Sequence, residues 1–313
     1  MKDVLISVND LKKSYGNNAV LSGLTFEVER GSIFALLGEN GAGKTTTVRI
    51  LSTLIKADAG KATIAGFDST KDAGAIRKLI SLTGQYAAVD ELLTGEENLQ
   101  MMARLHHFDR KTVKQRTEEL LTQFDLVDAA KRQAKTYSGG MRRRLDIAIS
   151  LIGSPKIIFL DEPTTGLDPR SRMNMWELIK ELARSGVTIF LTTQYLDEAD
   201  QLADKIAVIN AGKIVAEGTA EELKGLVGEE KIELSFQNQA DLELAQVYLD
   251  GHVDEKQLKI AITADGSTAS LRHLLNDLYT HGIEPTAIHY RKPTLDDVFL
   301  EMTSKQKKGV VLL

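Results

Sequence analysis

Hydrophobic and polar positions alternate in the first part of the chain, as they do in strands with one buried face. Leu24, Phe26 and Val28 fall on one side of such a strand, and polar or charged residues lie between them. Residues 33–37 are then continuously apolar, which is typical of a strand buried on both faces. Glycines follow, and residues 46–54 have helical spacing. The pattern predicts a strand, a glycine-rich loop and a helix in direct succession.

The middle of the chain changes to a charged, mostly helical pattern between about residues 72 and 135. Apolar runs typical of buried strands then return, and a helical segment separates the first two of them: strands at 157–160, 187–191 and 206–209, and a helix at 170–184. Strand, helix and strand in alternation indicate a parallel sheet with helices on both faces. Residues 205–217 are predicted to form a hairpin that turns at 211–212. The fold class is therefore expected to be α/β.

The composition shifts near residues 225–230, and short units follow. Their pattern alternates between the two kinds of element: strands at 231–236, 258–263 and 286–291, and helices at 240–249, 270–279 and 295–303. We predict a first domain over residues 1–228, a small α+β domain over 229–304 and a tail over 305–313. The small domain shows no phosphate loop, metal cluster or nucleophile pattern.

Charge and composition exclude several classes of protein. The formal net charge is -5, with Lys+Arg 39 against Asp+Glu 44, which argues against a general nucleic-acid binder. The three arginines at 142–144 are accordingly interpreted as a solvated helix face. The absence of cysteine excludes disulfides and thiolate metal sites. Charges within the first dozen residues make a signal peptide unexpected, and no run approaches the roughly 20 apolar residues of a membrane span.

The glycine-rich loop after the first buried strand fits the pattern G-x-x-x-x-G-K-[ST], with the residues Gly38-Glu39-Asn40-Gly41-Ala42-Gly43-Lys44-Thr45. Its glycines let backbone N–H groups converge on an anion, and the following helix adds its dipole. Lys44 is expected to reach the β- and γ-phosphates of ATP, and the Thr45 hydroxyl to bind Mg²⁺. A plain flexible turn is disfavoured, because the strand and the helix stand where the motif requires them. We include Thr46, the next residue, in the nucleotide-binding set.

The strand predicted at 157–160 ends in two carboxylates, Asp161 and Glu162. In an open α/β sheet, the carboxyl ends of the strands face the ligand crevice. Asp161 is therefore expected to hold Mg²⁺, and Glu162 to act on the attacking water as a general base. The alternative is a strand that simply leaves the core into solvent, and the phosphate loop in the same chain disfavours it.

A second anion-binding helix end is predicted at Tyr137-Ser138-Gly139-Gly140-Met141, before an amphipathic helix over 142–152. Ser138 is a good N-cap, and the two glycines leave the N–H groups of the helix accessible. Taken alone, this segment fits an ordinary N-cap equally well. Its position between the phosphate loop and the Asp-Glu strand favours the functional interpretation.

With these motifs in this order, residues 4–225 resemble the ATP-binding subunits of ABC transporters. The resemblance implies a mixed sheet core, an antiparallel β subdomain and a helical subdomain at about 86–155. It also implies that the small α+β domain over 229–304 is an accessory domain that stabilises the dimer or regulates it. It also implies that two cassettes pair head to tail, so that Ser138, Gly139, Gly140 and Met141 of one contact the γ-phosphate held by the other. The family usually has Leu-Ser-Gly-Gly-Gln, so Tyr137 and Met141 depart from its pattern.

Further positions match the family one by one. Tyr15 resembles the aromatic residue that stacks on adenine, and a strand-surface tyrosine is its alternative. Gln85 resembles the glutamine that touches Mg²⁺ and faces the membrane partner, against a solvated loop amide. The segment with Gly166, Leu167 and Asp168 resembles the loop that contacts the second cassette, and Asp168 before Pro169 is also a good N-cap.

The family has a switch histidine where this chain has Gln194, after Thr192 and Thr193. A glutamine can donate to a γ-phosphate oxygen but cannot take up a proton near neutral pH as histidine can. The segment 191–200 resembles the daunorubicin/doxorubicin-resistance-type exporters, and residues 293–300 resemble their closing motif. We expect Gln194 to sense the γ-phosphate, and a simple strand-end cap is the alternative.

The expected function is ATP hydrolysis that powers an export permease, with drugs or antibiotics as the leading substrate class. The implied cofactors are ATP and Mg²⁺, and the implied partners are a second cassette and a separate permease at the cytoplasmic face of the membrane. The alternatives are an ABC ATPase acting on ribosomes or DNA, which the lack of tandem cassettes disfavours, and an exporter of a lipid, polysaccharide or ion. A regulator without turnover is disfavoured by Glu162.

Overall fold

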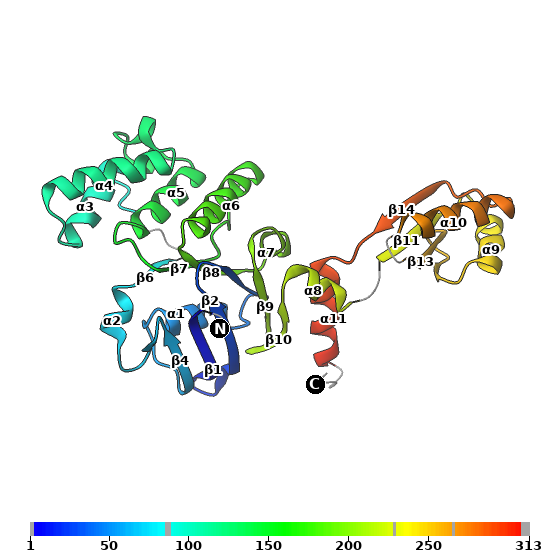
Figure 1. Ribbon diagram of the computed structural model, residues 1–313, viewed down its shortest axis with the longest axis horizontal. Coiled ribbons are helices and arrows are strands. Elements are labelled where there is room, and N and C mark those ends of the chain that lie inside the picture. Colours follow the sequence, from blue (N-terminus) through cyan, green and yellow to red (C-terminus); the bar gives the residue numbers. More distant parts are fainter. Residues whose placement is uncertain (1–2, 85–88, 228–229, 265–266, 308–313) are drawn as a thin grey trace. The chain divides into compact units, whose positions relative to one another are not determined.

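The computed structural model describes residues 3–84, 89–227, 230–264 and 267–307. The chain divides into two compact units, Met1–Ala220 and Glu221–Leu313 (Figure 1). The boundary predicted after residue 228 falls at 228–229, outside the described residues.

The first unit is built around a six-stranded sheet whose order is β10-β9-β3-β8-β7-β6. The strands have these bounds: β3 Ile33–Leu37, β6 Ile80–Thr83, β7 Ile157–Asp161, β8 Thr188–Thr193, β9 Lys205–Asn210 and β10 Lys213–Gly218. β3 pairs in parallel with β8 and β9, β7 pairs in parallel with β6 and β8, and β9–β10 form the predicted antiparallel hairpin. β3, β7 and β8 are buried at every position, as the apolar runs within their sequences predict.

An antiparallel sheet with the order β2-β1-β4-β5 packs against this core. Its strands are β1 Val4–Tyr15, β2 Asn18–Glu29, β4 Ala59–Ile64 and β5 Phe67–Asp68. Leu24, Phe26 and Val28 of β2 are buried, as their alternation predicts. The ring of Phe26 stacks on that of Phe34 in β3 with 5.1 Å between centroids, so the two sheets share one apolar interior.

The first unit also contains helices, and some of them lie together as a helical group. They are α1 Lys44–Leu51, α2 Ala73–Arg77, α3 Gly95–Leu105, α4 Arg110–Gln123, α5 Gly139–Ser150, α6 Pro169–Arg184 and α7 Leu196–Leu202, with 3₁₀ turns at Val127–Ala129 and Ala134–Thr136. Figure 1 shows α3, α4 and α5 beside one another, in cyan to green. β6 lies inside the segment 72–135 that was predicted to be mostly helical. With four residues, it is too short to show a period.

The second unit is a small α+β fold with a four-stranded sheet of order β12-β13-β11-β14. Its elements are α8 Ala220–Gly225, β11 Glu230–Ser235, α9 Gln239–Tyr248, β12 His252–Asp254, β13 Lys259–Ala264, α10 Thr268–Thr280, β14 Ala287–Arg291 and α11 Leu295–Lys307. Ile232, Leu234 and Ile260 of the sheet pack with Leu242 of α9 and Leu278 of α10. The sequence pattern missed β12, which has three residues and none buried.

Candidate nucleotide site

The carboxyl ends of three neighbouring strands bring the predicted motifs together. β8 lies between β3 and β7, so the residues that follow these strands meet at one edge of the sheet. The Gly38 N–H donates to the Thr193 carbonyl at 3.1 Å, and the Glu162 N–H donates to the Thr192 carbonyl at 3.1 Å. The end of β8 thereby connects the phosphate loop on one side to the two acids on the other.

Two glycines of the phosphate loop lie in close contact with neighbouring strands. A Cβ at Gly43 would lie 2.5 Å from Cδ2 of Leu21, and the φ angle of 112° is also one that only glycine adopts easily. A Cβ at Gly38 would lie 2.4 Å from the Ile209 carbonyl oxygen. These glycines let the loop lie directly on β2 and β9, which leaves Lys44 at the first position of α1.

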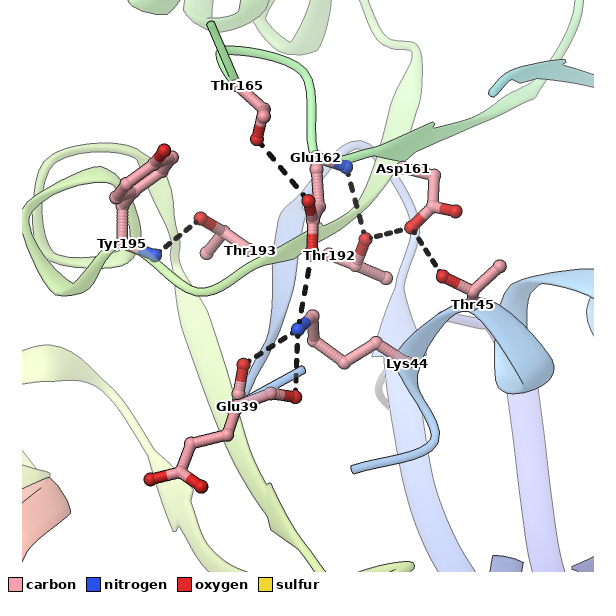
Figure 2. Close-up of polar contacts among 10 residues, drawn as sticks. Glu39, Lys44, Thr45, Asp161, Glu162, Thr165, Thr192, Thr193 and Tyr195 are labelled. Atoms are coloured by element: carbon pink, nitrogen blue, oxygen red, sulfur yellow. Dashed lines mark hydrogen bonds and ion pairs between the residues drawn. The ribbon is translucent and has the colours of Figure 1, made fainter. Parts of the chain in front are cut away.

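Lys44 is buried within the loop that it follows. Its Nζ donates to the carbonyl oxygens of Gly38 at 2.7 Å and Glu39 at 3.1 Å (Figure 2). Nζ also lies 3.4 Å from Oε1 of Glu162, and this ion pair joins the phosphate loop to the end of β7. Since an ammonium has three donors and no acceptor, these contacts fix a positive charge at the centre of the cluster.

Glu162 has a φ of 50°, in the left-handed region that residues with a side chain rarely adopt. Such a conformation costs about 1–3 kcal/mol and persists where the surroundings impose it, often at functional sites. The Thr165 hydroxyl donates to Oε2 of Glu162 at 3.3 Å, on the opposite side from Lys44 (Figure 2). The strained backbone thus turns the carboxylate toward Lys44.

One carboxylate oxygen of Asp161 accepts hydrogen bonds from two hydroxyl groups. Oδ1 accepts from Thr192 Oγ1 at 2.5 Å and from Thr45 Oγ1 at 3.4 Å. Mg²⁺ prefers hard oxygen ligands, and the Thr45 hydroxyl and Asp161 carboxylate form a donor set of that kind. The sequence placed Thr192 near the crevice but gave it no role. Its hydroxyl also accepts from the Glu162 N–H at 3.2 Å, so it contacts both acidic residues.

Residues beyond this cluster were also predicted to bind the nucleotide or Mg²⁺. Gln194 directly follows β8 and is half-buried, and Thr46 is half-buried in the first turn of α1. Tyr15, at the end of β1, is 49% exposed, with Lys13 Nζ 5.7 Å from its ring centre. Gln85 lies outside the described residues.

The second predicted anion-binding helix end is the N-terminus of α5, and it lies next to the start of α6. Ser138 is the N-cap of α5, and its Oγ accepts from the Met141 N–H at 3.2 Å. A Cβ at Gly140 would lie 2.8 Å from Ser171 Oγ, and one at Gly139 would lie 3.7 Å from Leu167 Cδ2. The two helix N-termini therefore approach closely.

An N-cap also stabilises the start of α6. Asp168 is the N-cap of this helix, with Pro169 at the first helical position, and its carboxylate accepts from the Ser171 N–H at 2.9 Å. Hydrogen bonds from Ser171 hold the pKa of Asp168 below its usual value. Asp168 thus stays ionised near neutral pH, where its charge favours the helix N-terminus.

Tyr137, which departs from the family pattern, has a structural role that its contacts explain. It is buried, its hydroxyl donates to the Ala129 carbonyl at 2.7 Å, and burial raises the pKa of the phenol. The tyrosine therefore anchors the segment before α5 to the helical group.

Sequence reasoning missed a buried carboxylate in α7. Glu198 is fully buried, and its Oε1 accepts from Thr164 Oγ1 at 2.7 Å and from Trp176 Nε1 at 3.3 Å. Burial raises the pKa of Glu198, while hydrogen bonds from Thr193, Thr164 and Trp176 oppose that shift. Nothing in the acidic run 197–200 distinguishes Glu198 from its neighbours in the sequence.

The interpretation of residues 142–144 as a solvated face was wrong for Arg143. The side chain of Arg143 is only 11% exposed, and it forms an ion pair with Asp146 at 3.0 Å. Arg142 pairs with Glu91 and Arg144 with Asp125, and both are more exposed than Arg143.

Comparisons with known proteins show the family of this chain. A family model described as "ABC transporter" matches residues 21–165, and one described as "ATP-binding protein DrrA1-3-like, C-terminal domain" matches residues 218–303. The chain is 45% identical to the daunorubicin resistance ATP-binding protein DrrA3 of Streptomyces coeruleorubidus, over 98% of each chain. It is 45% identical to the daunorubicin/doxorubicin resistance ATP-binding protein DrrA of Streptomyces peucetius, over 95% of this chain and 92% of that one.

Solved structures give the same result for the first unit. An ATP-binding subunit of an ABC transporter superposes with a TM-score of 0.63 and 29% identity, over 71% of this chain and 92% of that one. A nucleotide-free ATP-binding cassette superposes with a TM-score of 0.65 and 25% identity, over 72% and 95%. The expected fold class, an α/β ABC cassette with a small α+β domain, is confirmed.

The family model and the relatives identify the chain. They show that it is an ATPase. It belongs to the ATP-binding proteins of ABC transporters, in the group of the daunorubicin and doxorubicin resistance ATP-binding proteins.

Proposed function

We propose that this chain hydrolyses ATP to power an export permease, and that drugs or antibiotics are the exported class. The observation that carries the ATPase role is the contact between Lys44 and Glu162 at 3.4 Å, which joins the phosphate loop to the proposed base. The substrate class is supported by nearly full-length relatives whose names record resistance to daunorubicin and doxorubicin.

The proposed chemistry assigns a task to each residue of the cluster. The phosphate loop, residues 38–46, binds the β- and γ-phosphates through backbone N–H groups other than that of Gly38 and through the Lys44 ammonium, and orients them for in-line attack. Thr45 and Asp161 would hold Mg²⁺, with Gln85 as a further proposed ligand, and the bound ion would neutralise charge on the phosphate oxygens. Glu162 accepts a proton from the attacking water, and the half-buried Gln194 donates a hydrogen bond to the γ-phosphate.

A second copy of the chain completes the proposed site. Ser138, Gly139, Gly140 and Met141 present the N-terminus of α5 to the γ-phosphate bound by the partner. Gly166, Leu167 and Asp168 contact that partner, and Tyr15 stacks on adenine. The exposure of Tyr15 leaves its ring available for stacking.

The permease is proposed as a separate chain, with this subunit bound to it at the cytoplasmic face of the membrane. Among the residues that the structure describes, no helix is both long and apolar enough to span a bilayer. The proposed permease provides the path for the exported compound.

The test combines this chain with a membrane protein of about six spans encoded beside it, in inverted membrane vesicles. We expect ATP-dependent uptake of an anthracycline into the vesicles, and no uptake when the chain carries Glu162→Gln. Equal uptake in both preparations would contradict the proposal.

Export of a different class of compound is the second candidate. The chain is 35% identical to the Nod factor export ATP-binding protein I of Ralstonia nicotianae, over 97% of its length. Because identity to the drug-resistance relatives is higher, at 45%, we place drug export first. Turnover stimulated by a Nod factor, but not by daunorubicin, would reverse that order.

A further inference from the structure

Three consecutive arginines of α5 have three different environments, and the middle one reaches the proposed hydrolytic site. Arg142 pairs with Glu91, and the Arg144 guanidinium donates to the carbonyls of Phe124 and Asp125 within the helical group. Arg143 points instead toward the central sheet, where its contacts lie at the ends of β6 and β7.

One guanidinium links several segments that are distant in the sequence. Nε of Arg143 donates to the Pro163 carbonyl at 2.9 Å, Nη1 to the Gly84 carbonyl at 2.9 Å, and Nη2 to the Asp161 carbonyl at 3.4 Å. Nη1 also donates to Oδ2 of Asp146, one turn along α5, at 3.0 Å. Arg143 thereby joins α5 to the end of β7 and to the residue that follows β6.

The two carbonyls at the end of β7 belong to the residues on either side of Glu162. Glu162 is the residue with a φ of 50°, and its own N–H is held by Thr192. With Asp161 and Pro163 both bonded to Arg143, the strained peptide is fixed before, at and after Glu162. The carboxylate direction follows from this backbone conformation.

The arrangement specifically requires an arginine. A guanidinium is planar and donates from three nitrogen atoms in fixed directions, whereas a lysine ammonium is a compact point charge. Burial lowers the pKa of Arg143, and the carboxylates of Asp146, Asp161 and Glu198 oppose this. The carboxylate of Asp146 is almost fully buried beside Arg143, so the guanidinium charge is neutralised inside the protein.

We propose that Arg143 is a positioning residue for ATP hydrolysis, which holds the strained Glu162 peptide in the conformation that aims its carboxylate. The inference rests on the proposed role of Glu162 as general base. Arg143 contacts none of the phosphate-loop residues through the bonds given above, so it acts on the hydrolytic step and leaves nucleotide affinity to Lys44 and its loop.

The test uses the full-length chain with Arg143→Lys, and with Arg144→Lys as the matched change in the same helix. We expect Arg143→Lys to lower kcat at least tenfold and to change the Kd for a fluorescent ATP analogue by less than twofold. Arg144→Lys should leave kcat within twofold of wild type. An equal loss in both variants, or a loss of nucleotide affinity in Arg143→Lys, would overturn the proposal.

A double-mutant cycle with Glu162→Gln separates positioning from a general structural effect. If Arg143 acts through Glu162, adding Arg143→Lys to Glu162→Gln should lower the single-turnover rate by less than twofold. Full additivity of the two losses would overturn the proposal. Wild-type turnover in Glu162→Gln alone would instead refute Glu162 as the base, which is a distinct outcome.

Asp146→Asn provides a second variant should Arg143→Lys fold poorly. It removes the charge that holds Nη1 but keeps the size and an acceptor oxygen of the side chain. We expect a smaller loss of kcat than in Arg143→Lys, again with an unchanged Kd. An unaltered kcat in a folded Asp146→Asn protein would contradict the proposed arrangement.

Discussion

The two anion-binding helix ends of the first unit differ in what surrounds them within the chain. At the start of α1, Lys44 and Thr45 already contact both acids at the end of β7. At the start of α5, Ser138 caps its own helix, and Gly140 approaches Ser171 of α6. The first region brings Lys44, Thr45 and both acids of the proposed hydrolytic site into contact, whereas the contacts of the second region are those of a capped helix end packed on another helix. This difference is what a site shared between two copies requires.

Lys44→Ala should have the largest effect, because it removes the positive charge at the centre of the first region. We expect ATP turnover to fall to background. A phosphate-release assay measures the turnover. The control is Lys61→Ala, which changes an exposed lysine on β4. Undiminished hydrolysis by Lys44→Ala would refute the assignment of the phosphate loop.

Glu162→Gln should come next, since it removes the base but keeps the shape of the side chain. We expect ATP to bind with near-wild-type affinity and kcat to fall by roughly 10²–10⁴. Equilibrium binding and phosphate release on the same preparation separate the two quantities. Wild-type turnover would reassign the base.

Thr192→Val tests whether the buried hydroxyl between the two acids contributes to their geometry. The change keeps the shape but removes the donor to Asp161, so kcat should fall roughly tenfold, equivalent to about 1.4 kcal/mol. A larger Mg²⁺ concentration should be needed for half-maximal activity.

Thr188→Val is the matched control, because Thr188 is equally buried at the other end of β8 and its hydroxyl accepts from the Gly31 N–H at 2.8 Å. It should lower the melting temperature without changing the Mg²⁺ requirement. The same Mg²⁺ dependence in both variants would show that Thr192 contributes only to packing.

Ser138→Ala examines the second region. Loss of the N-cap should lower the free energy of unfolding by about 1 kcal/mol. ATP turnover should also fall several-fold at protein concentrations that favour dimers. Asp109→Ala removes the N-cap of α4 and should cost similar stability with little change in turnover. Equal turnover in both variants would remove the functional distinction between the two helix ends.

Glu198→Gln should have the smallest effect, which depends on pH. Because burial raises the pKa of Glu198 in the folded state, folding stability falls as the pH rises from the unfolded value of about 4.3 through the folded pKa. The variant lacks this titration, so it should be more stable than wild type at pH 8, with a difference that shrinks toward pH 4. Urea unfolding at both pH values measures it, and a pH-independent difference would contradict the assignment.

Local features of the sequence predicted much of the fold and the centre of the site. The continuous apolar runs of β3, β7 and β8 follow from burial on both faces, and the phosphate loop is a short segment whose own glycines and lysine specify its geometry. Asp161 and Glu162 were identified because they directly follow a buried strand. In each case the determining residues are neighbours in the chain.

Tertiary structure decided the positions whose contacts come from distant segments. Arg143 has the same sequence surroundings as Arg142 and Arg144, and only the packing of α5 on the end of β7 distinguishes it. Thr192 acquires its partners because β8 pairs with β7, about thirty residues away in the sequence. A sequence pattern records the periodicity of burial, but the direction of a single polar side chain depends on which strand or helix lies next to it.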